Sequence, residues 1–245
     1  MPLARVHGPP FLQEAFPVLL QIPDILTVDE VAHCRAVLET SPWVDGRVTA
    51  GDQAVKAKRN LQIPEDSEVS RQLGEVVLRA LARSPAFHSA ALPLRVLPPM
   101  FNRYDVGMTY GYHVDNSIRT IPGSGGMRMR ADVSTTIFLS DPDEYDGGEL
   151  MVEDTYGMKA VKLPAGHAVV YPSSSLHQVN PVTRGSRWAS FFFTQSLVKD
   201  DGLRAMLYDL DVAIIDLRQQ LGDENHAVLS VVNHYHNLLR RWAEV

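Results

Sequence analysis

The stretch KAVKLPAGHAVVYPSSSLHQVNPVTRGSRWASFFFTQSLV, from Lys159 to Val198, decides the fold class of this chain. It consists of short runs rich in valine and aromatic residues, separated by clusters of Gly, Pro, Ser and Asn. β-Branched and aromatic residues favour strands, whereas the residues of the clusters favour turns. No segment with a helical period separates the runs. Such a pattern predicts an antiparallel β-sandwich or barrel and argues against a parallel α/β sheet.

The same pattern begins further upstream, near Pro93. The runs LRVLPPMFNRYD, VSTTIFLSD and GELMVED follow one another before the stretch quoted above. The segment DPDEYDGGEL, which joins the last two of these runs, contains the pair Asp146-Gly147. Asp-Gly pairs adopt the positive φ angles that tight turns need, so we expect a hairpin at this pair.

Helical patterns flank the β region on both sides. Thr27 and Glu30 have the spacing of a capping box at the start of one helix, and residues 68–83 carry an apolar stripe with helical period. Near the C-terminus, residues 203–221 and 227–242 predict two more helices, separated by the sequence GDENH. We expect the first two helices to pack on the sheet. The last two should form a hairpin that docks on the sheet or on a second subunit.

Composition limits the classes of function. The chain has 245 residues, 45% of them hydrophobic and 21% charged, which is typical of a soluble globular protein. Its formal charge of -6 argues against nucleic acid as a partner, and no run is long and apolar enough for export or membrane insertion. The single cysteine, Cys34, cannot form an internal disulfide. We therefore expect a cytoplasmic protein that acts on a small molecule or a peptide.

The segment TYGYHVDNSI, from Thr109 to Ile118, contains a candidate metal site. Successive side chains of a strand point to opposite faces, so the side chains of His113 and Asp115 should point to the same face. A His-x-Asp triplet arises easily by chance, so the surrounding sequence must support the assignment of a metal site. Non-haem Fe(II) oxygenases bind iron through two histidines and one carboxylate, which requires a second histidine from a neighbouring strand. His177, after a turn rich in Pro and Ser, is the candidate.

Arg187 supplies a second clue, ten residues after His177. It begins an apolar strand, where a lone guanidinium needs a buried anion, and its planar fork matches a carboxylate better than a lysine does. Three protein ligands on one face of an octahedron leave three positions open. A chelating 2-oxo acid can fill two of them and dioxygen the third. Arg187 would then pair with the distal carboxylate of 2-oxoglutarate.

Three long segments together resemble one known family. They are FNRYDVGMTYGYHVDNSI, STTIFLSDPDEYDGGELMVEDTYG and VKLPAGHAVVYPSSSLHQVNPVTRGSRWASFFFTQSLV. In this order they are similar to the PKHD-type hydroxylases, bacterial relatives of the prolyl 4-hydroxylase catalytic domain among the Fe(II)- and 2-oxoglutarate-dependent dioxygenases. The resemblance extends from about Leu19 to the C-terminus, including the helical tail.

The resemblance implies a mainly β fold with flanking helices, built on a double-stranded β-helix or jelly roll. It implies Fe(II) held by His113, Asp115 and His177, with Arg187 on 2-oxoglutarate and Tyr104 assisting the binding of that cosubstrate. It also implies oxidative decarboxylation of 2-oxoglutarate to succinate and carbon dioxide, with hydroxylation of a substrate. Ascorbate is the implied reductant. The family's association with bacterial iron uptake suggests a siderophore-related or protein substrate but identifies none.

We divide the chain accordingly into three parts. Residues 1–16 contain three prolines and no clear period, and form an irregular arm. Residues 17–198 form the jelly-roll dioxygenase domain with its N-terminal helices, and residues 199–245 form the C-terminal helical extension. Two loops have alternatives: residues 55–60, VKAKRN, are either a solvated basic loop or a contact for an anionic substrate, and residues 117–133 are either a disordered loop or a lid.

Two other functions compete with the dioxygenase. One is a cupin-like jelly roll that binds a metal or small ligand without catalysis. The other is a zinc hydrolase, which uses the same types of ligand but gives Arg187 no role. The coexistence of the complete triad with Arg187 favours the oxygenase.

Overall fold

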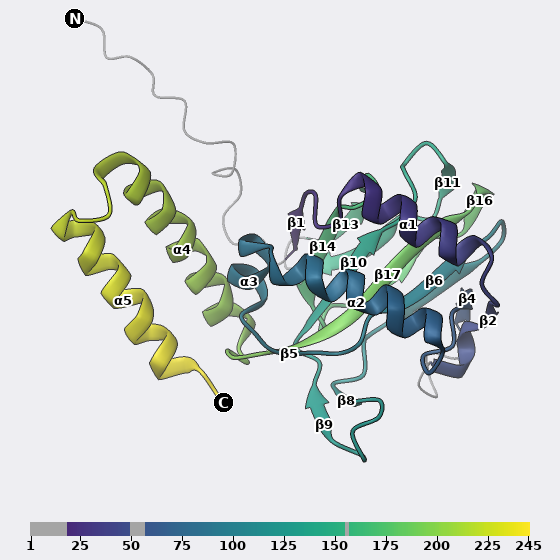
Figure 1. The fold of residues 1–245 in the computed structure, drawn as a ribbon, viewed down its shortest axis with the longest axis horizontal. Coiled ribbons are helices and arrows are strands. Elements are labelled where there is room, and N and C mark those ends of the chain that lie inside the picture. Colours follow the sequence, from purple (N-terminus) through teal and green to yellow (C-terminus); the bar gives the residue numbers. More distant parts are fainter. Residues whose placement is uncertain (1–18, 50–56, 155–156) are drawn as a thin grey trace, which may run out of the picture.

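Two antiparallel β-sheets form the centre of the molecule in a computed structural model, which describes residues 19–49, 57–154 and 157–245. Helices cover one sheet, and a separate pair of helices extends from one end (Figure 1). The predicted arm, residues 1–16, lies outside the described residues. So do Val55 and Lys56 of the predicted basic loop.

The larger sheet has eight strands in the order β1-β14-β10-β17-β6-β4-β2, with β5 also paired to β17. The strands are β1 (Leu20–Ile22), β2 (Val44–Asp45), β4 (Leu61–Gln62), β5 (Pro93–Val96), β6 (Met100–Tyr104), β10 (Val133–Phe138), β14 (Ala168–Pro172) and β17 (Arg187–Ser196). Strands β10 and β17 lie at its centre and are buried along almost their whole length. Their sequences, VSTTIF and RWASFFFTQS, are rich in the β-branched and aromatic residues that suit a buried strand.

The smaller sheet has five strands in the order β13-β12-β15-β7-β3. They are β3 (Lys58–Arg59), β7 (Thr109–His113), β12 (Leu150–Asp154), β13 (Gly157–Val161) and β15 (His177–Val179). Phe138 and Val169 of the larger sheet belong to the same buried cluster as Val152 and Val179 of the smaller one. The two sheets therefore pack face to face, and the predicted jelly-roll sandwich is confirmed.

Three helices precede the main strands: α1 (Val28–Glu39), α2 (Glu68–Ala82) and α3 (Pro85–Ala91). The predicted capping box begins α1, because the Thr27 hydroxyl accepts a hydrogen bond from the Glu30 amide while the Glu30 carboxylate accepts one from the Thr27 amide. The apolar faces of α1 and α2 share one buried cluster with β10 and β17, which includes Leu38, Leu73, Val77, Ile137 and Phe192. These helices thus cover the outer face of the larger sheet (Figure 1).

The prediction of a hairpin at Asp146-Gly147 is wrong. Residues 141–150 lead from β10 in the larger sheet to β12 in the smaller one, and pass through β11 (Tyr145–Gly147). Strand β11 pairs with β16 (Val182–Gly185), which lies much later in the chain. The positive φ angles fall on Gly147 and Gly148, and not on Asp146. A long-range strand pairing has thus overridden the local turn signal.

The glycine-rich segment 117–133 contains a two-stranded hairpin, formed by β8 (Ile118–Thr120) and β9 (Arg128–Arg130). Ile118 pairs with Arg130, so the segment has regular structure on both sides of its turn. The hairpin projects from the edge of the sandwich (Figure 1).

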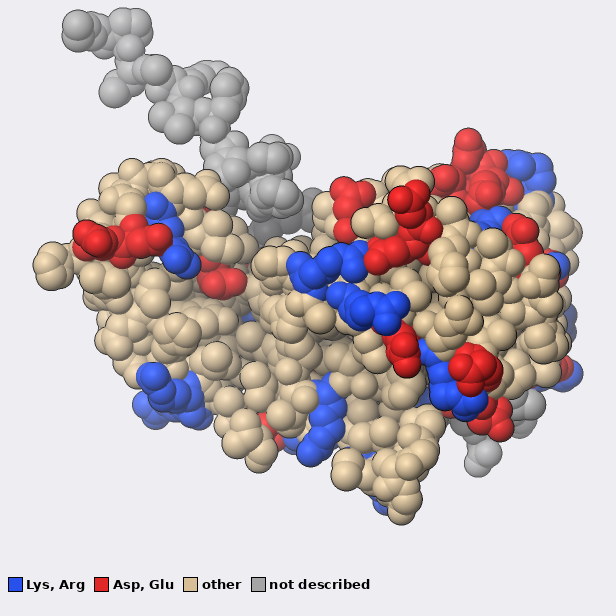
Figure 2. All heavy atoms as spheres, in the orientation of Figure 1, with Lys and Arg blue, Asp and Glu red and all other residues tan. Residues whose placement is uncertain are grey.

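Helices α4 (Asp201–Leu221) and α5 (His226–Trp242) form the predicted C-terminal hairpin. It packs beside α3 at one end of the sandwich, where Leu207 joins Leu92 and Val198 in a small buried cluster. None of the helices in the described ranges has the length and apolarity needed to cross a membrane. On the face shown in Figure 2, acidic and basic side chains are interspersed.

Candidate metal centre

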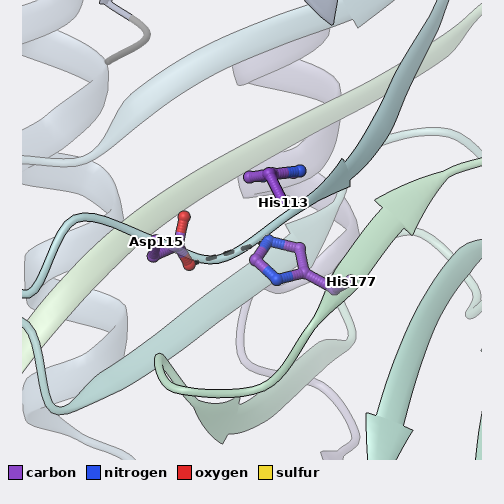
Figure 3. A group of neighbouring side chains, drawn as sticks. All are labelled: His113, Asp115 and His177. Atoms are coloured by element: carbon purple, nitrogen blue, oxygen red, sulfur yellow. Dashed lines mark ion pairs between the residues drawn. The ribbon is translucent and has the colours of Figure 1, made fainter. Parts of the chain in front are cut away.

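The three predicted metal ligands come together at the ends of two neighbouring inner strands of the smaller sheet. His113 ends β7, Asp115 follows two residues later, and His177 begins the neighbouring strand β15. The antiparallel register places His113 directly opposite His177. One potential ligand atom from each of the three residues lies within 4.8 Å of the others. Figure 3 shows the three side chains converging on one space from these separate elements.

Backbone carbonyls determine which ring nitrogen of each imidazole carries a proton. The Nδ1 atom of His113 lies 2.8 Å from the Gly111 carbonyl oxygen, and the Nδ1 atom of His177 lies 3.0 Å from the Ser175 carbonyl oxygen. A carbonyl oxygen can only accept, so each Nδ1 must carry the proton. In the neutral form of each imidazole, the Nε2 atom then presents a lone pair to the shared space. This is how metal-binding histidines are usually oriented.

The carboxylate is held by the opposite sheet. The Ser134 hydroxyl, on β10, donates a 2.7 Å hydrogen bond to Oδ2 of Asp115 and lies 2.7 Å from the Ser173 hydroxyl. The same Oδ2 lies 3.6 Å from Nε2 of His177. Ser134 thus orients the carboxylate, while the other lone pairs of Asp115 remain available to an ion.

The surroundings keep His113 neutral. Burial and then the nearby His177 lower the pKa of His113 to about 3, although the hydrogen bond to Gly111 acts in the opposite direction. The Tyr110 ring stacks on the imidazole with 3.5 Å between ring centroids. A neutral imidazole is the form that binds a metal.

Arg187 lies deep between the sheets and is only 1% exposed. Its guanidinium carbon lies 5.4 Å from the centroid of the Tyr104 ring and 5.1 Å from that of Phe138. Within the described part of the chain, its Nε atom has no hydrogen-bond acceptor, and no carboxylate forms an ion pair with it. A buried cation without an anion is costly, so this guanidinium is a strong candidate to bind an anionic ligand.

Tyr104 lies beside Arg187, because the two residues are directly opposite in the pairing of β6 with β17. Burial raises the pKa of the Tyr104 hydroxyl to about 12, although the charge of Arg187 opposes this shift. The hydroxyl therefore stays protonated at neutral pH and can donate a hydrogen bond.

One cavity joins these groups, lined by the three predicted ligands together with Tyr104 and Arg187. Three buried polar atoms in its wall have no partner in the described residues: Oδ1 of Asn102, Oγ1 of Thr135 and Nε of Arg187. Buried polar groups normally have partners, so their clustering here indicates a space shaped for a polar ligand.

Two further residues of this site were not singled out from the sequence. Ser134 lies within the run VSTTIF, which resembles any buried strand. Lys58 lies in the predicted basic loop, and it is buried at 4% exposure in the wall of the same cavity. Polar residues alternate from Lys58 through Asn60 to Gln62, all of them buried, and this period of two was a signal of extended chain with an inward polar face. The segment contains the short strands β3 and β4, which belong to different sheets.

The donor set fits Fe(II) well. Two imidazoles and one carboxylate, placed on one side of a shared space, match the facial triad of non-haem Fe(II) oxygenases. The triad and the buried guanidinium line one cavity, so a single small anion could contact both.

Comparison with known proteins agrees with this geometry. Residues 99–195 match the family model of the 2OG-Fe(II) oxygenase superfamily, and residues 201–244 match that of the PKHD-type hydroxylase C-terminal domain. A PKHD-type hydroxylase of Cupriavidus metallidurans is 69% identical over 228 residues, which is 93% of this chain and 100% of the relative. The chain belongs to the PKHD-type hydroxylases. It is therefore a dioxygenase of a family that uses Fe(II) and 2-oxoglutarate.

Solved structures support the fold of this PKHD-type hydroxylase. A prolyl-4-hydroxylase from Pseudomonas putida is 22% identical with a TM-score of 0.50, and the match covers 72% of this chain and 92% of that chain. HygX from Streptomyces hygroscopicus, crystallised with nickel, 2-oxoglutarate and hygromycin B, is 17% identical with a TM-score of 0.51, covering 74% and 84%. At these identities the likeness concerns the jelly-roll fold alone.

Proposed function

We propose that this chain hydroxylates a small-molecule or peptidyl substrate, with Fe(II) held by His113, Asp115 and His177 and with 2-oxoglutarate held by Arg187. One observation carries the proposal: two imidazoles and a carboxylate share a cavity with a buried guanidinium whose Nε atom has no partner among the described residues. When bound, Fe(II) and 2-oxoglutarate would supply, together with dioxygen, an oxidative decarboxylation to succinate and carbon dioxide coupled to hydroxylation of a C–H bond, with one oxygen atom entering succinate and the other the new hydroxyl group.

The protein's own groups perform the binding and orientation. The Gly111 and Ser175 carbonyls hold the two imidazoles with Nε2 toward the iron, and Ser134 holds the carboxylate. Arg187 selects a dicarboxylic oxo acid, since its planar fork can donate two parallel hydrogen bonds to the distal carboxylate. Tyr104 donates its hydroxyl proton toward the same carboxylate. The buried walls exclude water from this end of the cavity.

The decisive test is anaerobic addition of Fe(II) and 2-oxoglutarate to the full chain. A visible charge-transfer band of the iron chelate should appear, and admission of air should then produce succinate. Asp115→Ala should lose both signals. Asp146→Ala, which removes an exposed carboxylate paired with Arg184, is the matched control and should retain them. Succinate formation by Asp115→Ala at the rate of the unmodified chain would refute the assignment of this ligand.

The same experiment separates the competing functions. A cupin-like binding protein would bind the metal but give neither the chelate band nor succinate. A zinc hydrolase would show no dependence on 2-oxoglutarate. We also propose ascorbate as the reductant that restores oxidised iron, so ascorbate should raise the number of turnovers before the enzyme inactivates. A substrate connected with iron uptake or homeostasis is proposed from the family resemblance.

The division into an arm (1–16), a dioxygenase domain (17–198) and a C-terminal extension (199–245) also remains our proposal. We also propose that two chains can associate through α4 and α5. Sedimentation of the full chain, compared with a chain ending at residue 198, tests whether the extension is needed for folding, for association or for neither.

A further inference from the structure

The imidazole of His113 is held less tightly by burial than that of His177. His177 is 4% exposed, whereas His113 ends β7 and is half-buried. The plane of a histidine ring depends on a torsion with broad preferences, so the side chain's own geometry leaves the ring free to turn. A metal bond needs the Nε2 lone pair to point at the ion, and the ligand ring must be oriented for this. A contact from a neighbouring residue is therefore needed to fix the plane of the His113 ring.

The ring of Tyr110 provides such a contact. It stacks on the His113 imidazole with 3.5 Å between ring centroids and 18° between ring planes. Tyr171 contacts His177 differently, with 5.3 Å between centroids and 66° between planes, which is an edge-on arrangement. A ring stacked at this distance blocks rotation of the imidazole, because turning would drive the edge of the imidazole into the face of the tyrosine. The stacked ring therefore holds His113 in one plane.

A β-bulge brings the two rings to the same face of β7. In a regular strand, the side chains of residues 110 and 113 would point to opposite faces. The pairing of β7 with β15 places His113 opposite His177 and Tyr110 opposite Val179, so three residue steps on β7 match two on β15. Tyr112, within the bulge, is 53% exposed. Bulges commonly redirect side chains beside functional sites, and this one turns Tyr110 toward the cavity that it lines.

Gly111 fixes the geometry of the bulge. Its carbonyl oxygen lies 2.8 Å from Nδ1 of His113, and its amide donates a 3.0 Å hydrogen bond to the Ala57 carbonyl. A Cβ atom at Gly111 would lie 3.1 Å from the Cβ atom of Ala57, so a neighbouring segment approaches closely at this point. The bulge thus supplies both contacts that orient His113, the hydrogen bond at Nδ1 and the stacked ring.

We infer that Tyr110 is a positioning residue of the metal centre, whose ring holds the His113 imidazole in the plane in which Nε2 faces the ion. The flat ring carries this role, and the hydroxyl does not. This inference rests on the proposed function, since it takes His113 as an iron ligand.

Three variants of the full chain test the role of the ring. Tyr110→Phe keeps the ring, whereas Tyr110→Leu and Tyr110→Met remove it. Fe(II) affinity is measured anaerobically by competition with a chelator. The dissociation constant should stay nearly unchanged in Tyr110→Phe and should rise about tenfold or more in the other two variants, as is typical when a group that orients a metal ligand is lost. The visible absorption of the Co(II)-loaded protein, which reports the arrangement of the ligands, should change in the same two variants only.

Tyr112→Leu is the matched control, because Tyr112 is a tyrosine of the same strand, next to His113, but is exposed. It should leave both measurements unchanged. Thermal unfolding of the metal-free chain shows which variants fold, and Tyr110→Met carries the test if Tyr110→Leu does not fold. If neither folds, the ring is structural and the inference is overturned.

Three other results would also overturn it. In the first, the leucine and methionine variants at position 110 bind Fe(II) as tightly as the unmodified chain. In the second, Tyr110→Phe loses as much affinity as they do. In the third, Tyr112→Leu shows the same loss as Tyr110→Leu. Equal Fe(II) affinity of His113→Ala and the unmodified chain would instead refute the proposed function.

Discussion

Arg187→Met offers the sharpest test of the proposed cosubstrate site. The substitution keeps much of the side-chain volume but removes a guanidinium that is 1% exposed and whose Nε atom has no acceptor in the described residues. If this group pairs with a carboxylate of 2-oxoglutarate, its loss leaves a buried anion unpaired. Such a loss costs about 2 to 5 kcal/mol, a roughly 30- to 4,000-fold rise in the dissociation constant.

The stability of the ligand-free protein should respond differently. Arg187 is a buried cation whose contacts with the Tyr104 and Phe138 rings offset only part of its desolvation in the absence of an anion, so methionine should leave the free energy of unfolding unchanged or raise it. In the unmodified chain, 2-oxoglutarate at about 100 times its dissociation constant adds about 2.7 kcal/mol, or roughly 5 to 10 °C in the unfolding midpoint. That shift should disappear in Arg187→Met at the same concentration.

Thermal unfolding with anaerobic Fe(II), with and without 2-oxoglutarate, measures both quantities in one experiment. Arg184→Met is the control. Arg184 lies three residues before Arg187, is exposed and forms an ion pair with Asp146. Arg187→Lys should show a 2-oxoglutarate shift of the unfolding midpoint between those of Arg187→Met and Arg184→Met, because it keeps the charge but loses the planar fork. A destabilised ligand-free Arg187→Met protein with an unchanged 2-oxoglutarate shift would show that the guanidinium is structural, and would refute the assignment.

Three further results are expected. Ser134→Ala removes the 2.7 Å hydrogen bond that orients the ligand carboxylate and should weaken Fe(II) binding about 10- to 100-fold in a competition assay with a chelator. Gly147→Ala should lower the free energy of unfolding by more than about 2 kcal/mol, since its Cβ atom would lie 2.1 Å from a backbone oxygen. Gly222 has a similar φ but lies in open space, so Gly222→Ala should lower the free energy of unfolding by about 1 kcal/mol. Urea unfolding measures both values. The pKa of His113 is about 3 in the folded metal-free protein and about 6.5 in the unfolded chain, so the unfolded chain binds the extra proton between these values. Stability should therefore fall as the pH drops from about 6.5 toward 3, by up to about 1.4 kcal/mol per pH unit, and His113→Gln should flatten the slope by that amount.

Much of the fold was accessible from local sequence patterns. The capping box of Thr27 and Glu30, the helix that ends at Ala82 and the C-terminal hairpin all lie where the sequence predicted them. The patterns that succeeded are those whose cause is local: capping, helical period and alternation along a strand. The hairpin at Asp146-Gly147 failed because β11 pairs with a strand from a distant part of the chain, and no local signal reports such a partner.

The same distinction applies to the site. The spacing of His113 and Asp115 predicted both on one strand, but β7 ends at His113 and Asp115 lies in the loop that follows. The need for a second histidine led to His177, which the structure places opposite His113. Ser134 and Lys58 could not be found in this way. Both residues reach the site through tertiary packing. Ser134 on β10 contacts the carboxylate of Asp115, the proposed ligand, and Lys58 on β3 lies beside β7.

The origin of the site residues also explains why buried polar atoms are tolerated between the sheets. His113, Asp115 and His177 belong to the smaller sheet or the loop that follows it, whereas Ser134 and Arg187 belong to the larger one. A ligand that contacts both the triad and the guanidinium must therefore bridge the two layers. In the ligand-free protein the polar groups at this point weaken the contact between the sheets, because three polar atoms in the cavity wall have no partner within the described ranges. Iron and the oxo acid would supply those partners, so binding should stabilise the contact between the two sheets at this cavity.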